Sequence, residues 1–217
     1  MTLKWYGQAF FKIVIKNSQK ENVVLAIDPF DKTLGPKVPN FPADILLISH
    51  SHYDHSNKSA IKGTPFLIEG PGEYERKGIF IKGILGFHDN SKGKERGTIT
   101  IYKISGEDMS VCHLSDIGQN SLTEEQMDEL GEIDILLIPV GGIYTIGAKQ
   151  ASEIIAQVEP KIVIPMHYKI PGVKVNLQGV EKFLKIMGLE NITPQEKLKI
   201  SSKDLPKEET QVLLLQP

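Results

Sequence analysis

The sequence predicts a layered α/β protein, and three observations support this fold class. Five short runs of Ile, Leu and Val end abruptly in polar or small residues, as strands buried on both faces of a sheet do. Three segments with helical spacing of apolar residues accompany these runs. Two further regions resemble hairpins and meanders with polar connections. The 217 residues are enough for one or at most two compact domains, and we expect residues 1–217 to form a single domain.

The expected elements alternate between strands and helices in the second half of the chain. The β-rich regions are 1–30 and 78–116, with polar connections at 16–22 and 88–97. The buried strands are expected at 23–30, 44–50, 110–116, 134–142 and 161–168, and the helices at 121–131, 147–160 and 176–188. Sites in such α/β folds usually lie at the carboxyl ends of strands, because the loops that leave those ends can converge.

Each expected helix has its own start and stop signals. Thr123 and Gln126 form a capping box for the first helix, which Gly131 ends. The second helix stops at Pro160 after an apolar face made of Ala148, Ala151, Ile155 and Val158. Asn176 is the expected cap of the third helix, whose apolar face contains Leu177, Val180, Phe183, Leu184 and Met187.

Composition excludes some classes of function. The net charge is −2, only two arginines are present, and the lysines are scattered among acidic residues, so nucleic-acid binding is disfavoured. No apolar run approaches the roughly 18 residues of a membrane span, and the N-terminus does not resemble a secretion signal. The single cysteine, Cys112, cannot form an internal disulfide, which agrees with a reducing compartment. We therefore expect a cytoplasmic protein without a membrane partner; oligomerisation stays open.

The segment HSHYDH, residues 50–55, is the strongest functional signal. If the preceding apolar run is a strand, the rings of His50 and His52 point to the same side and can share one metal ion. Asp54 and His55 are adjacent, so the chain must turn and present them to a different point. A second metal ion is the economical interpretation. Mixed imidazole and carboxylate ligands favour Zn²⁺, with Mn²⁺ or Fe²⁺ as alternatives.

HSHYDH has the form H-x-H-x-D-H, and the chain resembles the metallo-β-lactamase-fold hydrolases over nearly its whole length. IDPF, GFHD, HLSD and PMHY follow in the order expected for that family. FHDN, KERG, HLSD, PVGG-x-Y-T and PMHY resemble most closely the ascorbate-6-phosphate lactonase-like subgroup. The resemblance implies a four-layer αββα sandwich with a metal site at one edge between two sheets.

The resemblance also implies a set of metal ligands. His50, His52 and His88 would hold the first ion; Asp54, His55 and His167 would hold the second; and Asp116 would bridge both. His113 is the rival of His88 as a direct ligand, and we otherwise expect it to orient a ligand or substrate, or to protonate the leaving group.

Three further positions bear on this comparison. Asp28 is expected to support the histidine segment through backbone hydrogen bonds instead of ligating a metal ion. Gln8 stands where relatives often have histidine, which puts in doubt a substrate role of that imidazole. Ser115 stands where glycine is frequent.

Two divalent ions in such a site can share a water and deliver hydroxide without a protein nucleophile. We expect metal-assisted hydrolysis by a bridging hydroxide, which Asp54 could steer. The positive surplus of the site favours a small anionic metabolite, such as a lactone or a phosphoester. Arg96 is a candidate for binding its phosphate or carboxylate. Gly142, Tyr144 and Thr145, in a loop between a strand and a helix, are the other candidate substrate contacts, with a simple tight turn as the alternative for its glycines.

Two other interpretations stay open at this level. A nuclease or phosphodiesterase of the same superfamily would need a basic stripe near the site, for which the composition offers little support. A metal-binding or regulatory module without turnover would have less need of every ligand position, whereas all seven candidates are present.

Overall fold

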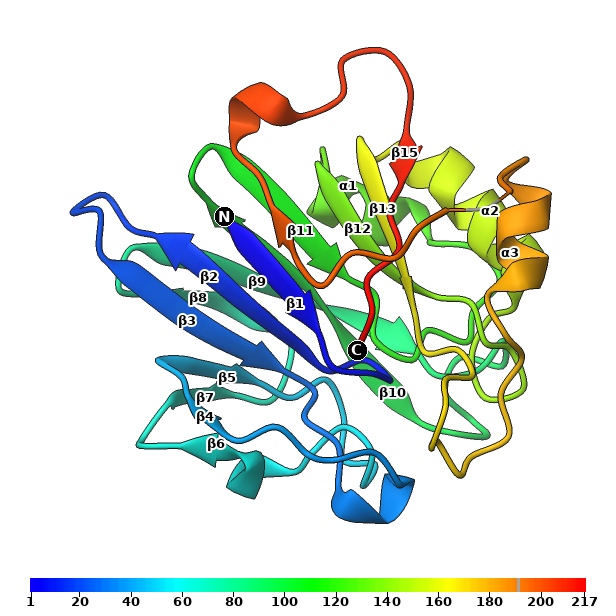
Figure 1. The fold of residues 1–217 in the computed structure, drawn as a ribbon, viewed down its shortest axis with the longest axis horizontal. Helices are drawn as coiled ribbons and strands as arrows, with labels where there is room; N and C mark the ends of the chain where they lie inside the picture. The colour runs from blue at the N-terminus through cyan, green and yellow to red at the C-terminus, as the bar shows by residue number, and fades with distance from the viewer. Residues whose placement is uncertain (191) are drawn as a thin grey trace.

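Two β-sheets packed face to face form the centre of the fold (Figure 1). The computed structural model describes residues 1–190 and 192–217. The six-stranded sheet has the order β14 (Leu198–Lys199), β1 (Thr2–Trp5), β2 (Phe11–Lys16), β3 (Asn22–Ile27), β5 (Ile45–Leu47) and β7 (Phe66–Ile68). The seven-stranded sheet has the order β15 (Gln211–Val212), β13 (Ile162–Met166), β12 (Ile135–Pro139), β11 (Met109–His113), β10 (Thr98–Gly106), β9 (Ile79–Phe87) and β8 (Gly72–Arg76). A separate pair joins β4 (Phe41–Pro42) to β6 (Ile61–Lys62).

The expected strands all form, and their burial explains their composition. β1, β2 and β3 make an antiparallel meander, and β9, β10 and β11 make a second one. The continuous apolar runs become β5, β12 and β13, in which every residue is buried. These strands pair in parallel with their neighbours, as expected for strands covered on both faces.

The inner faces of the two sheets meet closely. Gly106 of β10 faces Ile15 of β2, where a Cβ atom on residue 106 would come within 2.7 Å of the isoleucine side chain. The hydroxyl of Tyr102 crosses the interface and donates to the carbonyl of Ile48, 2.8 Å away. The core therefore joins residues from both halves of the chain.

In the part of the chain that the structure describes, three α-helices follow the second meander and lie beside the seven-stranded sheet (Figure 1): α1 (Glu124–Leu130), α2 (Ala148–Val158) and α3 (Glu181–Ile186). The predicted capping box of Thr123 and Gln126 is confirmed, and Gly131 ends α1 with a positive φ of 54°. The described residues also contain three 3₁₀ helices, η1 (Lys32–Leu34), η2 (Lys58–Ala60) and η3 (Ser202–Asp204). Within the described residues, no helix has the length and apolar character needed to cross a lipid bilayer.

The third helix is shorter than expected, and Asn176 is not its cap. α3 begins after Val180, because the preceding segment is paired with other parts of the backbone. The amide of Gln178 donates to the carbonyl of Gly141, and its carbonyl accepts from the amide of Lys169. These hydrogen bonds hold residue 178 in a non-helical conformation, a constraint that apolar spacing does not reveal.

The direction of the strands determines where the site forms. In the first sheet β1, β3 and β5 run the same way, because β2 is antiparallel to β1 and β3, and β5 is parallel to β3. In the second sheet β9, β11, β12 and β13 share one direction by the same reasoning. Loops that leave the carboxyl ends of these strands can therefore converge at one edge.

Candidate metal centre

The first candidate metal set consists of three imidazoles from two strand ends. His50 and His52 follow β5, and His88 follows β9. His50 Nε2 lies 3.1 Å from His52 Nδ1, a separation compatible with two ligands at about 2.0–2.1 Å from one zinc ion. His88 completes this group, whose ligand atoms lie within 4.8 Å of one another. The expectation that these two rings of the motif point to a common position is thus met.

The second candidate metal set comes from the turn of the motif and from the end of β13. Asp54, His55 and His167 each offer one ligand atom within 4.8 Å of the others. The rings of His55 and His167 are stacked, with centroids 5.7 Å apart. His167 has a φ of 52°, so the chain turns sharply after β13 and directs the ring into the site.

Asp116, which follows β11, lies between the two sets. Its Oδ2 is 3.1 Å from His55 Nε2 and 3.6 Å from His88 Nε2. Its Oδ1 is 3.2 Å from His167 Nε2. One carboxylate therefore reaches ligands of both sets, as a bridging ligand would.

The chemistry of these donors fits divalent cations. Buried polar atoms without a hydrogen-bond partner among the described residues gather in this region: His55 Nε2, His88 Nδ1, His167 Nδ1, Asp116 Oδ1 and Gln8 Oε1. Buried polar groups are normally paired, so such a concentration calls for a ligand or ion. Neutral imidazoles and carboxylates are the donors that Zn²⁺ and related transition metals take.

A buried polar network holds the histidine segment from below. Ser49 donates its amide to Asp28 Oδ1 at 2.8 Å and its hydroxyl to Asp28 Oδ2 at 2.6 Å, so the predicted supporting role of Asp28 is confirmed. Since the Ser49 hydroxyl proton is used, His50 Nδ1 donates to Ser49 Oγ at 2.9 Å. His55 Nδ1 donates to Asp28 Oδ2 at 3.1 Å. Both rings therefore direct Nε2 towards the metal sets.

Burial and neighbouring charges determine the protonation of His50, His55 and Asp116. Burial and the neighbouring His55 lower the pKa of His50 to about 3, so this ring is a neutral ligand. Burial would lower the pKa of His55, but the charge of Asp116 and the hydrogen bond to Asp28 raise it well above its usual value. Burial would raise the pKa of Asp116, yet His167 and His55 hold it well below its usual range. The carboxylates thus favour a positive charge at this point, which a proton or a bound cation supplies.

Ser115 extends the supporting network at a position where the backbone favours glycine. Its φ is 52°, in the left-handed region that costs a side-chain-bearing residue roughly 1–2 kcal/mol. Its hydroxyl donates to Ser49 Oγ at 2.6 Å. The hydroxyl therefore reinforces the acceptor of His50 Nδ1 at the expense of backbone strain.

Changing Ser115 to glycine is expected to affect folding and metal binding differently. Relief of strain and loss of one hydrogen bond oppose each other, so the free energy of unfolding of the metal-free protein should change by less than about 1 kcal/mol. The affinity for the first metal ion should fall about tenfold, as for other outer partners of metal-bound histidines. Urea unfolding and metal titration measure the two quantities. Ser115→Ala, which keeps the strain, should show the same affinity loss with a less stable fold; unchanged affinity in both variants would contradict this role.

His113 is not available for the proton-donor role expected from the sequence. Its Nε2 lies 2.9 Å from the carbonyl of Ala9, and its Nδ1 accepts from the amide of Ser115 at 3.2 Å. Burial is the largest influence on its pKa, which is lowered, so the ring is neutral with both nitrogens engaged. With both ring nitrogens engaged, His113 has no free ring atom to offer a substrate, and His88 is the residue that joins His50 and His52.

A cavity of about 630 Å³ opens above the two sets. It is lined by Ser51, His52, Tyr53, Asp54, His88, Arg96, Asp116, Tyr144, His167 and Val175. Tyr53 is 51% exposed and Tyr144 41% exposed, so aromatic rings line the mouth of the cavity and histidines and carboxylates its floor. Sequence reasoning missed Tyr53 as a wall of the cavity, although its place inside HSHYDH was a usable signal.

Arg96 reaches this cavity because two loops hold it in place. Asp89 accepts four backbone amides, from Ser91, Gly93, Glu95 and Arg96, at 2.7–3.0 Å, and so orders the loop after His88. Arg96 Nη1 donates to the carbonyls of residues 143 and 144 at 3.1 and 2.6 Å, and the guanidinium lies over the Tyr144 ring. Its hydrogen bonds to the described residues use Nη1, so the rest of the planar fork can serve an anion.

The cavity lining includes neither Gly142 nor Thr145, the two loop residues expected to contact substrate together with Tyr144. Gly142 donates to the carbonyl of Ile146, and Thr145 Oγ1 donates to the same carbonyl at 3.2 Å. Gly141 does permit a close backbone approach, because a Cβ atom there would lie 2.0 Å from the carbonyl oxygen of His167. The close approach of Gly141 to the His167 backbone helps to position the second candidate metal set, and it lies outside the cavity lining.

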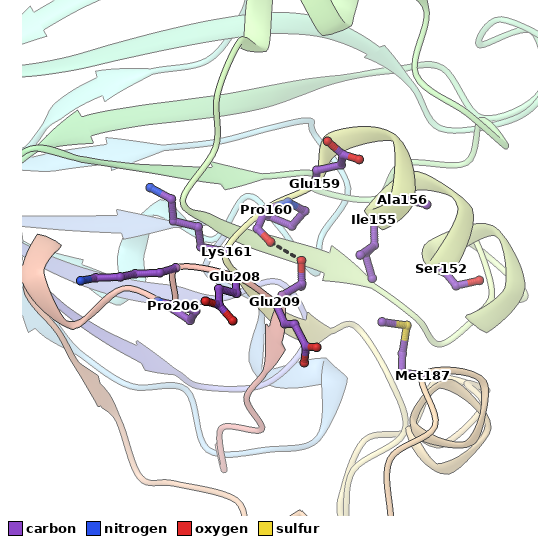
Figure 2. A pocket seen from close by; sticks show the side chains of 12 residues that line it. Ser152, Ile155, Ala156, Glu159, Pro160, Lys161, Met187, Pro206, Glu208 and Glu209 are labelled. Atoms are coloured by element: carbon purple, nitrogen blue, oxygen red, sulfur yellow. Dashed lines mark hydrogen bonds between the residues drawn. The ribbon is translucent and has the colours of Figure 1, made fainter.

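A second hollow lies away from this centre, between α2 and residues 206–210 (Figure 2). Its volume is about 640 Å³, and Thr210 Oγ1 donates to the carbonyl of Pro160 beside it at 2.6 Å. Lys161 at its edge forms an ion pair with Asp134, with Nζ and Oδ1 2.7 Å apart. The candidate ligand groups of the described residues all lie elsewhere. The candidate metal ligands of the described residues therefore surround the other cavity, the one above Asp116.

Comparisons with known proteins agree with this geometry. The family described as Beta-lactamase superfamily domain matches residues 2–167. A UPF0173 metal-dependent hydrolase of Methanopyrus kandleri is 27% identical and covers 88% of this chain and 94% of its own length. Another, of Staphylothermus marinus, is 30% identical and covers 76% of this chain and 82% of its own.

A solved structure extends the similarity to the whole fold. The crystal structure of a candidate Zn-dependent hydrolase of the metallo-β-lactamase superfamily, from Thermotoga maritima, has a TM-score of 0.79 and 35% identity. The match covers 99% of this chain and 98% of that one. The fold class predicted from the sequence is therefore confirmed.

Proposed function

The chain belongs to the metallo-β-lactamase superfamily, among the UPF0173 metal-dependent hydrolases, and from this premise we propose that it is a dinuclear, zinc-dependent hydrolase of small anionic metabolites. The observation that carries the proposal is the pair of ligand sets joined by Asp116 on the floor of one cavity. We propose a lactone or a phosphoester as substrate, in keeping with the resemblance to ascorbate-6-phosphate lactonase-like proteins.

The proposed roles follow from where each side chain lies. His50, His52 and His88 would hold one ion, Asp54, His55 and His167 the other, with Asp116 between them. Two divalent ions held in this way supply Lewis acidity and an activated water at neutral pH. The candidate ligands are spread between residues 50 and 167 of the sequence and converge on a single site. This convergence supports the proposal that residues 1–217 work as one domain.

Substrate would enter past the two tyrosines with its anionic group towards Arg96. The guanidinium pairs with a carboxylate or phosphate through two parallel N–H groups, which orients the scissile bond towards the floor of the cavity. Burial and the charge of Asp54 raise the pKa of Tyr53, so its hydroxyl stays protonated and can donate a hydrogen bond to the substrate. Since His113 is engaged elsewhere, the leaving group takes its proton from solvent on the open side of the cavity.

The experiment that tests the proposal combines metal analysis with hydrolysis assays. Purified protein is expected to hold two metal ions per chain and to hydrolyse lactones or phosphomonoesters in a panel that also contains phosphodiesters and β-lactams. His52→Ala should remove one ion and lower activity by more than about a hundredfold, because even outer partners of metal ligands cost 10–100-fold.

Phe80→Ala is the matched control, because this exposed side chain lies outside the cavity. It should leave both the metal content and the turnover as they are in the natural chain. Activity that survives His52→Ala unaltered would refute the proposal, and preferential cleavage of phosphodiesters would replace it with a nuclease or phosphodiesterase.

A further inference from the structure

Gln8 is a buried amide that none of the roles above explains. It follows β1, whose carboxyl end lies at the same edge as those of β3 and β5. The residue has no solvent exposure and a φ of 49°, which is unusual for a residue other than glycine. Its carbonyl accepts from Trp5 Nε1 at 2.8 Å and from the amide of His167 at 3.0 Å. The strained backbone is thus locked between the core and the second ligand set.

The side chain of Gln8 points into that set. Its Nε2 lies 3.0 Å from Asp54 Oδ2 and 2.9 Å from His167 Nε2. Its Oε1 is buried and has no partner among the described residues. One terminal atom of the amide therefore occupies the space between two candidate metal ligands, at the separations that ligands of a common ion have.

His167 Nε2 faces both the Gln8 amide and the Asp116 carboxylate, and no single placement of its proton gives both contacts a donor and an acceptor. If His167 Nε2 carries the proton and donates to Asp116 Oδ1, 3.2 Å away, it cannot accept from the Gln8 amide. If Nε2 is unprotonated, its lone pair faces the Asp116 carboxylate. A cation removes this conflict, because the histidine, the aspartates and an amide oxygen can all direct lone pairs at it.

Rotation of the amide about its last side-chain bond is all that is needed to present the oxygen. That torsion is broad and roughly two-fold, and the oxygen and nitrogen ends of an amide are interchangeable in shape. The nitrogen end of the amide faces the Asp54 carboxylate as a donor. With a cation between Asp54 and His167, the oxygen end takes its place.

We propose that Gln8 is a ligand of the second metal ion, through its amide oxygen, beside Asp54, His55 and His167. This inference rests on the proposed function, because it assumes that a metal ion binds there. It makes the second position richer in oxygen ligands than the first, which has three imidazoles. Oxygen ligands suit harder ions, so the second position should accept Mn²⁺ more readily than the first.

Metal titration of the apoprotein tests the proposal without relying on activity. The dissociation constants of the first and second ions are measured calorimetrically with Zn²⁺, and Mn²⁺ occupancy by electron paramagnetic resonance. Gln8→Leu should weaken the second ion at least about tenfold and leave the first within twofold. His52→Ala is the matched variant of the other set and should show the reverse pattern.

Gln8→Glu keeps the proposal testable if the leucine variant folds poorly. A carboxylate of the same length retains an oxygen ligand, while its charge repels Asp54 in the metal-free protein. Its apoprotein should melt at a lower temperature, and the second ion should bind more tightly and restore the loss. Unchanged affinity and unchanged metal-induced stabilisation would overturn the role of Gln8.

The outcomes separate this inference from the proposed function. Two ions in the natural chain, with the second bound equally well by Gln8→Leu, would refute the ligand role and leave the hydrolase proposal standing. One ion in the natural chain, weakened by Gln8→Leu, would refute the dinuclear proposal and keep Gln8 as a ligand. One ion that the substitution leaves unaffected would refute both.

Discussion

Replacing Asp116 by asparagine is expected to have the largest effect on metal binding and turnover. This carboxylate is 3% exposed and its two oxygens approach ring nitrogens of His55, His88 and His167. Asparagine keeps the size of the side chain but loses the charge that offsets the cations, and it places an N–H group where a lone pair is needed. We expect both ions to bind at least about a hundredfold more weakly, since this ligand reaches both sets and even outer partners cost 10–100-fold.

Metal titration and turnover at saturating Zn²⁺ measure this effect. Asp204→Asn is the matched control, because this exposed aspartate ends η3, pairs with Ser201 in its capping box and lies outside the cavity. It should leave both dissociation constants within twofold of the natural values. Two ions bound with natural affinity by the Asp116→Asn protein would refute the bridging role.

Replacing Trp5 by alanine is expected to have the largest effect on stability. Trp5 is completely buried, its ring lies 4.9 Å from the Tyr168 ring between centroids, and its Nε1 donates to the carbonyl of Gln8 at 2.8 Å. Removing a buried tryptophan side chain costs about 3–5 kcal/mol through lost burial and the cavity left behind. Urea unfolding of the metal-free protein should show this decrease in the free energy of unfolding.

Two comparisons make the Trp5 result interpretable. Phe80→Ala removes an aromatic ring that is 58% exposed and should change the free energy of unfolding by less than about 0.5 kcal/mol. Trp5→Phe keeps most of the packing and loses the hydrogen bond to Gln8, so it should lie between the two. A loss below about 1 kcal/mol in Trp5→Ala would show that this part of the core repacks.

Local patterns were sufficient for most of the fold. A strand that is buried on both faces consists of a few consecutive apolar residues. The runs that form β5, β12 and β13 could therefore be recognised from their composition alone. The capping box at Thr123 is equally local, since it depends on a residue three positions away. The start of α3 could not be recognised in this way, because the segment before it is held by the carbonyl of Gly141.

The candidate site also has a part that could be predicted from local sequence and a part that could not. The sequence by itself determined the histidine motif, because His50, His52, Asp54 and His55 lie within six residues and the strand before them orients the rings. Only the tertiary structure decided that His88, and not His113, completes the first set. The reason is a hydrogen bond from His113 to Ala9, 104 positions away in the chain.

Tertiary structure also decided which loop residues face the cavity and that Gln8 meets His167 across 159 positions. Periodicity reports whether a residue is buried and on which side of its own strand. It carries no information about which ring nitrogens are already hydrogen-bonded, since their partners come from other strands. The residue type of each candidate ligand could therefore be read from the sequence, whereas its partners depend on the shared direction of three strands in one sheet and four in the other.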